Sequence, residues 1–144
     1  MIYQHWKNEE QTELIQNSKV KMQNEKDKFK KDFIKRLVNF SIVIIRFSEK
    51  LRERKVFWSI IDQLIRSSTS IGANVIEAKS SSSKRDYLHF FEIALKSSNE
   101  SKYWLILIRE CTPEFKDEAV KLLGEAEEIS KILGASVLTL KGKK

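Results

Sequence analysis

Hydrophobic residues recur at intervals of three and four along four stretches of the chain. These stretches cover residues 27–54, 57–79, 83–111 and 113–140. Such spacing places the hydrophobic residues on one face of a helix. Only four glycines and one proline are present, which argues against an all-β fold with its many turns. Because short connections join successive helices, we predict an all-α protein, an antiparallel up-down four-helix bundle.

The first of these helices has an unusually wide hydrophobic face. Its main stripe is formed by residues at helical spacing: Phe29, Phe33, Leu37, Phe40, Ile44, Phe47 and Leu51. Val38, Ile42 and Ile45 widen the face in the second half of the helix. A face of this width in a small bundle predicts a second neighbour, such as another subunit.

Small side chains run through the hydrophobic faces of the second and third helices, in the segments 66–78 and 87–108. The predicted core stripe of the second helix is Phe57, Ile61, Leu64, Ser68, Ile71, Val75 and Ala78. Small residues let two helix backbones approach closely, and the polar atoms among them must then find partners. We predict that Arg66, Asn74, Glu77 and Glu100 form a structural polar network that holds helices or subunits in register. An acid–base role for Glu77 or Glu100 is the alternative, but the sequence supplies no second catalytic partner.

The ends of the helices carry capping signals. Ser83 with Asp86 three residues later resembles a capping box, and Thr112 before Pro113 is predicted to cap the last helix. Residues 1–26 have sparse, loosely periodic apolar residues, so we expect an N-terminal lead-in that is a frayed or partly disordered helix. The bundle domain is predicted at residues 27–140, with a basic tail at residues 141–144.

The net charge of +7 is concentrated in one segment, because residues 27–55 hold ten Lys and Arg against four acids. We predict that seven basic residues contact nucleic acid: Lys30, Lys31, Lys35, Arg36, Arg52, Arg54 and Lys84. In an up-down bundle, the basic start of the first helix shares one end with the serine run at 80–83, which Lys79, Lys84 and Arg85 flank. We expect these residues to form a basic rim. A solvated helix face explains the same charge, so composition leaves both interpretations open.

Residues typical of catalytic and metal sites are sparse. His5 and His89 form no Cys-x-x-Cys or His-x-x-x-His pattern, and His89 is expected at the solvent or at an interface. Cys111 is expected to be a half-buried structural cysteine rather than a nucleophile. We therefore predict no enzymatic activity, no catalytic residue, no metal, no cofactor and no small-molecule substrate.

The chain has no stretch of about 18 apolar residues, so we expect no membrane span. Its first residues lack the apolar core of a secretory signal, and its single cysteine excludes an internal disulfide. We expect a cytoplasmic protein.

Two segments resemble the signatures of a known family. The segment IRSSTSIGANVIEAKS, residues 65–80, resembles the Arg-x-Ser-x-Ser-Ile-x-x-Asn-Ile-x-Glu-Gly signature of the four-helix bundle proteins encoded in intervening sequences of 23S rRNA genes. The segment from Asp86 to Ile108 resembles the family's second signature, with an aromatic start, Ile-Ala, a serine and a glutamate. Ala78 and Lys96 stand where the family usually has glycine.

The resemblance implies an antiparallel four-helix bundle that assembles as a homopentamer, with no established enzymatic activity. It also implies kinship with the accessory variability protein of diversity-generating retroelements, whose barrel looks similar and carries a basic surface that binds nucleic acid. We expect a homo-oligomer that binds RNA or DNA through its basic surface. The alternative is a protein–protein assembly module with no role in nucleic-acid binding.

Overall fold

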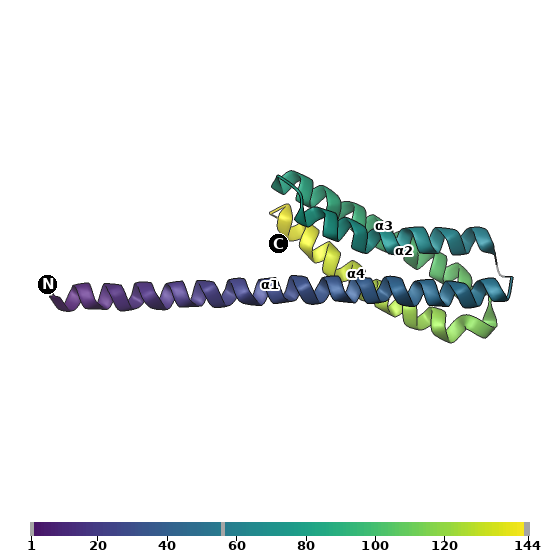
Figure 1. Cartoon of the computed structure of the whole chain (residues 1–144), viewed down its shortest axis with the longest axis horizontal. Coiled ribbons are helices and arrows are strands. Elements are labelled where there is room, and N and C mark those ends of the chain that lie inside the picture. The colour runs from purple at the N-terminus through teal and green to yellow at the C-terminus, as the bar shows by residue number, and fades with distance from the viewer. Residues whose placement is uncertain (1, 56, 143–144) are drawn as a thin grey trace. The chain divides into compact units, whose positions relative to one another are not determined.

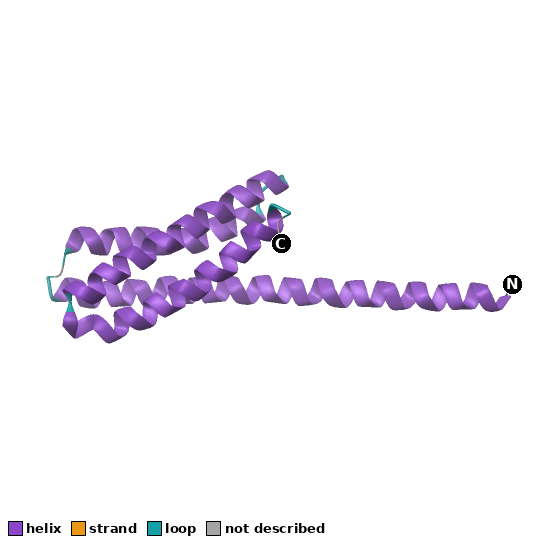
Figure 2. Ribbon diagram, turned by 180° about the vertical axis from the view of Figure 1, so that it is seen from behind, coloured by secondary structure: helices purple, strands orange, loops and turns teal. Residues whose placement is uncertain are grey.

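The computed structural model describes residues 2–55 and 57–142. Over these residues the protein consists of helices and short connections, without a strand (Figures 1 and 2). The four α-helices are α1 (Ile2–Glu53), α2 (Trp58–Lys79), α3 (Lys84–Cys111) and α4 (Lys116–Leu140). A short 3-10 helix, η1 (Pro113–Phe115), lies between α3 and α4. The predicted all-α class with four helices is confirmed, and residues 143–144 of the predicted basic tail lie outside the described residues.

Helix α1 begins at Ile2 rather than near residue 27, so the lead-in is helical throughout its described length. Every described side chain from residue 7 to residue 30 is exposed. The helix continues because residues 2–35 contain no glycine or proline and many Lys, Glu and Gln residues, which are good helix formers. Weak hydrophobic periodicity therefore reflected the absence of a buried face, not the absence of a helix.

The chain divides into two compact units between Lys35 and Arg36. The smaller unit is residues 1–35, and the larger unit contains residues 36–53 of α1 together with α2, α3 and α4. Sequence periodicity placed the start of the bundle at residue 27. The division observed in the structure falls nine residues later, inside α1.

The core of the larger unit is built from hydrophobic residues at helical spacing. In its part of α1 the buried hydrophobic residues are Leu37, Phe40, Ile44, Phe47 and Leu51, all from the predicted stripe, and in α4 they include Leu122, Ala126, Ile129 and Leu133. Removing such side chains from water contributes about 1.5–3 kcal/mol for each large one. Phe57 was predicted in the core but is 50% exposed, because it lies before the first residue of α2. Phe29 is also exposed, and it belongs to the smaller unit.

The capping predictions have different outcomes at the two ends of α3. The Ser83 hydroxyl accepts a hydrogen bond from the backbone N–H of Asp86, as predicted for a helix N-cap. Thr112 does not cap the following helix, because its hydroxyl donates to the carbonyl oxygen of Ile108 in the last turn of α3. A threonine hydroxyl can bond to the carbonyl four residues earlier, and this local bond is the one formed.

Candidate nucleic-acid interface

Buried serines join α2 to α3. The Ser68 hydroxyl donates to Ser101 at 3.2 Å, and Ser101 lies 2.9 Å from Ser67. Ser97 donates to Ser70 at 3.0 Å. We call these five residues, together with Ser98 and Ser130, the serine seam. Because hydroxyls both donate and accept, a row of serines can satisfy itself without water.

The serine seam extends to α4 through a contact that the sequence analysis missed. The hydroxyls of Ser98 and Ser130 lie 2.8 Å apart, and both residues are buried. Ser130 sits four residues after Ala126 and next to Ile129, within the hydrophobic stripe of α4. That position was a usable signal, since a serine inside a core stripe needs a partner across the helix interface.

The four residues predicted to form the polar network have different roles. Asn74 is part of it, because its amide donates to the Ser70 carbonyl and hydroxyl at 2.8 and 2.9 Å. Glu100 is exposed and accepts from the Trp104 indole on its own helix. The side chains of Arg66 and Glu77 are exposed and form no hydrogen bond or ion pair with the described residues. Within the chain, serines rather than these charged residues connect the helices, and a role between subunits stays a prediction.

Three of the seven predicted nucleic-acid contacts are arginines that face carboxylates. The Arg36 guanidinium forms a two-bond fork with Glu125, with distances of 2.5 and 3.0 Å. Arg52 pairs with Asp62 at 2.5 Å, and Arg54 lies 4.0 Å from Glu114. The hydrogen bond with Glu125 raises the pKa of the Arg36 guanidinium above its ordinary value, against the lowering effect of burial. Arg36 therefore stays charged and is held toward α4.

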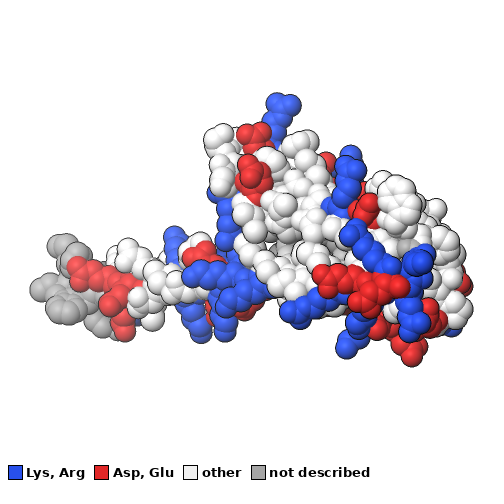
Figure 3. All heavy atoms as spheres, turned by 45° about the vertical axis from the view of Figure 1, so that its right-hand side comes forward, with Lys and Arg blue, Asp and Glu red and all other residues white. Residues whose placement is uncertain are grey.

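The other four predicted contacts are lysines without such partners. Lys30, Lys31, Lys35 and Lys84 are exposed, and none forms an ion pair with a described residue. The first three belong to a lysine stretch that we define by its seven members: Lys19, Lys21, Lys26, Lys28, Lys30, Lys31 and Lys35. Blue side chains gather along this part of the helix in Figure 3. The rim expected to join these lysines to the serine run at 80–83 stays a prediction.

The structure also places the residues considered for other chemistry. Cys111 is exposed, so the expectation of a half-buried cysteine was wrong. It is the last residue of α3, where the chain turns toward η1. His89 is exposed beside the Phe90 ring, with ring centroids 5.9 Å apart. The described residues contain no group of three or more His, Cys, Asp or Glu able to hold a metal ion, and no helix long and apolar enough to cross a membrane.

An apolar face of α1 in the larger unit is exposed. Val38, Ile42 and Ile45 are 45%, 41% and 40% exposed. They are the residues that widen the hydrophobic face in the sequence, and they lie outside the buried stripe of Leu37 to Leu51. We call them the second face of α1.

Comparison with known proteins agrees with this architecture. The profile of the family described as 23S rRNA-intervening sequence protein matches residues 29–135. A crystal structure of a protein with unknown function, from the S23 ribosomal protein family of Bacteroides thetaiotaomicron VPI-5482, is 31% identical, with a TM-score of 0.68. The match covers 73% of this chain and 97% of that one. No curated protein gave a match. With its four helices, its serine-lined helix contacts and a family match over most of its length, the chain belongs to the 23S rRNA-intervening sequence protein family.

Proposed function

We propose that this protein is a non-enzymatic, oligomeric four-helix bundle that binds RNA or DNA through its basic surface. The observation that carries the proposal is the lysine stretch, whose seven exposed lysines form no ion pair with a described residue. An unpaired lysine can neutralise a phosphate and release a counterion without first breaking a contact within the protein. The family description, which refers to 23S rRNA intervening sequences, is compatible with a nucleic-acid partner.

The presence or absence of a carboxylate partner ranks the seven predicted nucleic-acid contacts. Arg36, Arg52 and Arg54 each have a carboxylate within 4.0 Å, so a phosphate would compete with an existing partner. Lys30, Lys31, Lys35 and Lys84 have no such competition. We therefore assign most of the phosphate contacts to the lysines.

The proposed arrangement is antiparallel, and the proposed assembly is a homopentamer. Seam contacts support the antiparallel direction of α2 and α3, because Ser68 meets Ser101 while the later Ser70 meets the earlier Ser97. The second face of α1 supports assembly, since three neighbouring apolar side chains exposed by 40% or more suit a protein contact. The number five comes from the family resemblance.

That second face also favours the alternative function, a protein–protein assembly module with no nucleic-acid role. In this alternative, the lysines only keep the surface hydrated. We favour nucleic-acid binding, because the charge is concentrated on one segment instead of being spread over the surface. We further propose that the protein has no catalytic residue, cofactor or small-molecule substrate, and that it acts in the cytoplasm, where a single unpaired cysteine is typical.

The test is a binding titration with labelled RNA and DNA at about 50 and about 200 mM salt. Replacing Lys30, Lys31 and Lys35 together by glutamine should weaken binding and reduce the slope of log affinity against log salt by about 2 for a single strand. The matched control replaces Lys96, Lys116 and Lys121, which are exposed lysines of the larger unit without ion pairs to described residues. No binding of the unaltered protein at low salt, or equal losses in both triple variants, would contradict the proposal.

A further inference from the structure

A hollow of about 380 Å³ lies where α2 ends, α3 begins and α4 ends. The residues that line it are Ala78, Lys79, Ser81, Ser82, Ser83, Lys84, Tyr87 and Leu140. Its volume lies toward the lower end of the range of ligand pockets, about 300–1,000 Å³. The hollow belongs entirely to the larger unit, and α2, α3, α4 and the connection between α2 and α3 form its lining.

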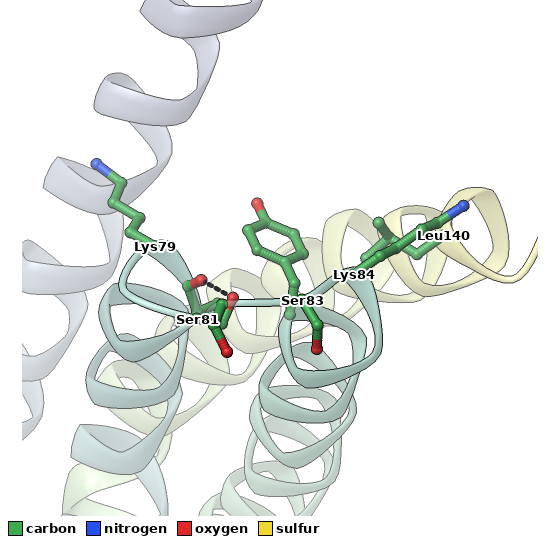
Figure 4. A pocket seen from close by; sticks show the side chains of 8 residues that line it. Lys79, Ser81, Ser83, Lys84 and Leu140 are labelled. Carbon is green, nitrogen blue, oxygen red and sulfur yellow. Dashed lines mark hydrogen bonds between the residues drawn. The ribbon is translucent and has the colours of Figure 1, made fainter.

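Two lysines stand on opposite sides of this hollow. Figure 4 shows Lys79 on one side and Lys84 on the other, beside Leu140, with Ser81 and Ser83 between them. Neither lysine forms an ion pair with any described residue, and both are exposed. The hydroxyls of Ser81 and Ser83 are already engaged, with the Ala78 carbonyl and the Asp86 N–H. The two charged residues of the lining are therefore both cationic, and the Ser82 hydroxyl forms no hydrogen bond with the described residues.

The hollow also has an apolar and aromatic lining. Ala78, Leu140 and the ring of Tyr87 supply it. The Tyr87 ring stacks on Phe91, with centroids 4.8 Å apart and planes inclined by 20°. Phe91 is buried in the core, so this contact packs one face of the tyrosine ring against the core. No hydrogen bond of the Tyr87 hydroxyl is formed with the described residues.

We propose that this hollow binds one unpaired nucleotide of a single-stranded RNA or DNA segment, with its base against Tyr87 and its flanking phosphates near Lys79 and Lys84. The inference rests on the proposed nucleic-acid binding and deepens it, because it names a preference for unpaired bases. A π-surface with cations on both sides is the combination that single-strand binders use. A base-paired nucleotide presents no free ring face, so a duplex could use only the lysines.

The experiment compares a fluorescently labelled single-stranded RNA with a hairpin duplex of similar length, using the full chain. We expect tighter binding of the single strand. Tyr87→Leu should weaken single-strand binding roughly 5- to 150-fold, the range given by stacking energies of about 1–3 kcal/mol per base. It should leave duplex binding within about two-fold. Tyr87→Phe should restore most of the lost binding, because phenylalanine keeps the ring face.

The lysines are tested separately. Replacing Lys79 and Lys84 by glutamine should reduce the salt slope for the single strand by about 1.4, at about 0.7 for each phosphate contact. The control pair is Lys116 and Lys121, replaced in the same way. A free mononucleotide should compete only at concentrations at least about a hundred-fold above the strand, since it makes one of several contacts. Competition at equal concentration would assign the site to free nucleotides and overturn the inference.

A second measurement uses the unaltered protein, so it does not depend on whether a variant folds. A single-stranded RNA containing a photoreactive thiouridine, irradiated with the unaltered protein, should crosslink to the peptide that contains Tyr87. Crosslinks found only in other peptides would contradict the proposed nucleotide site in the hollow while leaving the proposed function standing. Equal affinity of the unaltered protein and a folded Tyr87→Leu variant would do the same. If the unaltered protein bound neither RNA, the proposed function would fail and the inference with it.

Discussion

At the scale of single residues, serine hydroxyls form the polar contacts between helices that the sequence had suggested for charged side chains. Ser101 is fully buried and lies at the centre of the serine seam. It accepts from Ser68, and its own hydroxyl lies 2.9 Å from both Ser67 and the Ser97 carbonyl. Since buried polar groups are costly to leave unpaired, each of these short side chains constrains the position of its neighbours.

Ser101→Ala should lower the free energy of unfolding by about 1–3 kcal/mol, because the Ser68 hydroxyl would lose its acceptor in the core. Urea unfolding followed by circular dichroism measures the change. Ser59→Ala, at an exposed serine of α2 without a described hydrogen bond, is the control and should change stability by less than about 0.5 kcal/mol. Equal effects of the two substitutions would show that the seam hydroxyls contribute no specific stabilisation.

Tyr87 gives the fold a dependence on alkaline pH. Burial raises the pKa of its phenol above the ordinary value of about 10. The unfolded chain therefore releases the phenol proton at a lower pH than the folded chain does. The contribution of Tyr87 to the free energy of unfolding is intact below about pH 10 and falls as the pH rises toward the folded pKa. Tyr87→Phe should lose less stability than the unaltered protein over that range. Parallel curves of melting temperature against pH for the two proteins would refute this.

Residue-level predictability followed the type of interaction. Ser83 was identified as a cap because capping depends on neighbours in sequence. Helical spacing placed small side chains on the hydrophobic face of residues 87–108, where Ser97, Ser98 and Ser101 are buried. Arg66 and Glu77 match the family signature, but their side chains form no hydrogen bond or ion pair with the described residues. Which exposed cations are paired could not be read from the sequence, because Arg36 and Glu125 are 89 positions apart.

At the scale of elements, helix boundaries were predictable where a breaker or cap marks them. α2 ends just before the serine run at 80–83 and α3 begins just after it, and α4 ends at Leu140 as its spacing indicated. The start of α1 was missed, because periodicity detects a buried face and residues 7–30 have none. In residues 7–30 the helix forms because its residues are good helix formers, without the help of a buried face.

Helix α4 contains two glycines that it does not need. A Cβ atom added at Gly124 or Gly134 would meet nothing within 4 Å outside its own turn. Glycine in a helix interior is less favourable than alanine by about 0.5–1 kcal/mol, so Gly124→Ala and Gly134→Ala should each raise the melting temperature by a few degrees.

The control for these variants is Gly142→Ala. Gly142 has a φ of +73°, a left-handed conformation that alanine adopts poorly, so this substitution should bring no gain. A loss of stability in Gly124→Ala or Gly134→Ala would mean that the glycines serve a contact outside the single chain.

At the scale of the whole molecule, the second face of α1 is the feature most in need of an explanation. The sequence singled out Val38, Ile42 and Ile45 as a widening of the hydrophobic face, and the single chain leaves all three exposed. What packs against these residues could not be predicted, because a sequence shows which face is apolar but not which molecule covers it.

Light scattering tests the proposed assembly. The unaltered protein should form a particle of five times the chain mass of 16.9 kDa, and Ile42→Lys should reduce it, because a buried ammonium group is costly at an apolar interface. Ile76→Lys alters an apolar residue of α2 with similar exposure, 47%, and should preserve the mass. A monomeric unaltered protein, or an unchanged mass in Ile42→Lys, would exclude this face as the interface.

The exposed run of α1 from residue 7 to residue 30 has a consequence for how the protein can change over time. None of its described side chains is buried, so substitutions there alter charge and helix propensity without disturbing any core contact. The serines between α2, α3 and α4 have no such freedom, because each hydroxyl depends on another. We expect related proteins to vary widely in the length of the first segment and in its residues outside the lysine stretch, while the packed helices tolerate few exchanges.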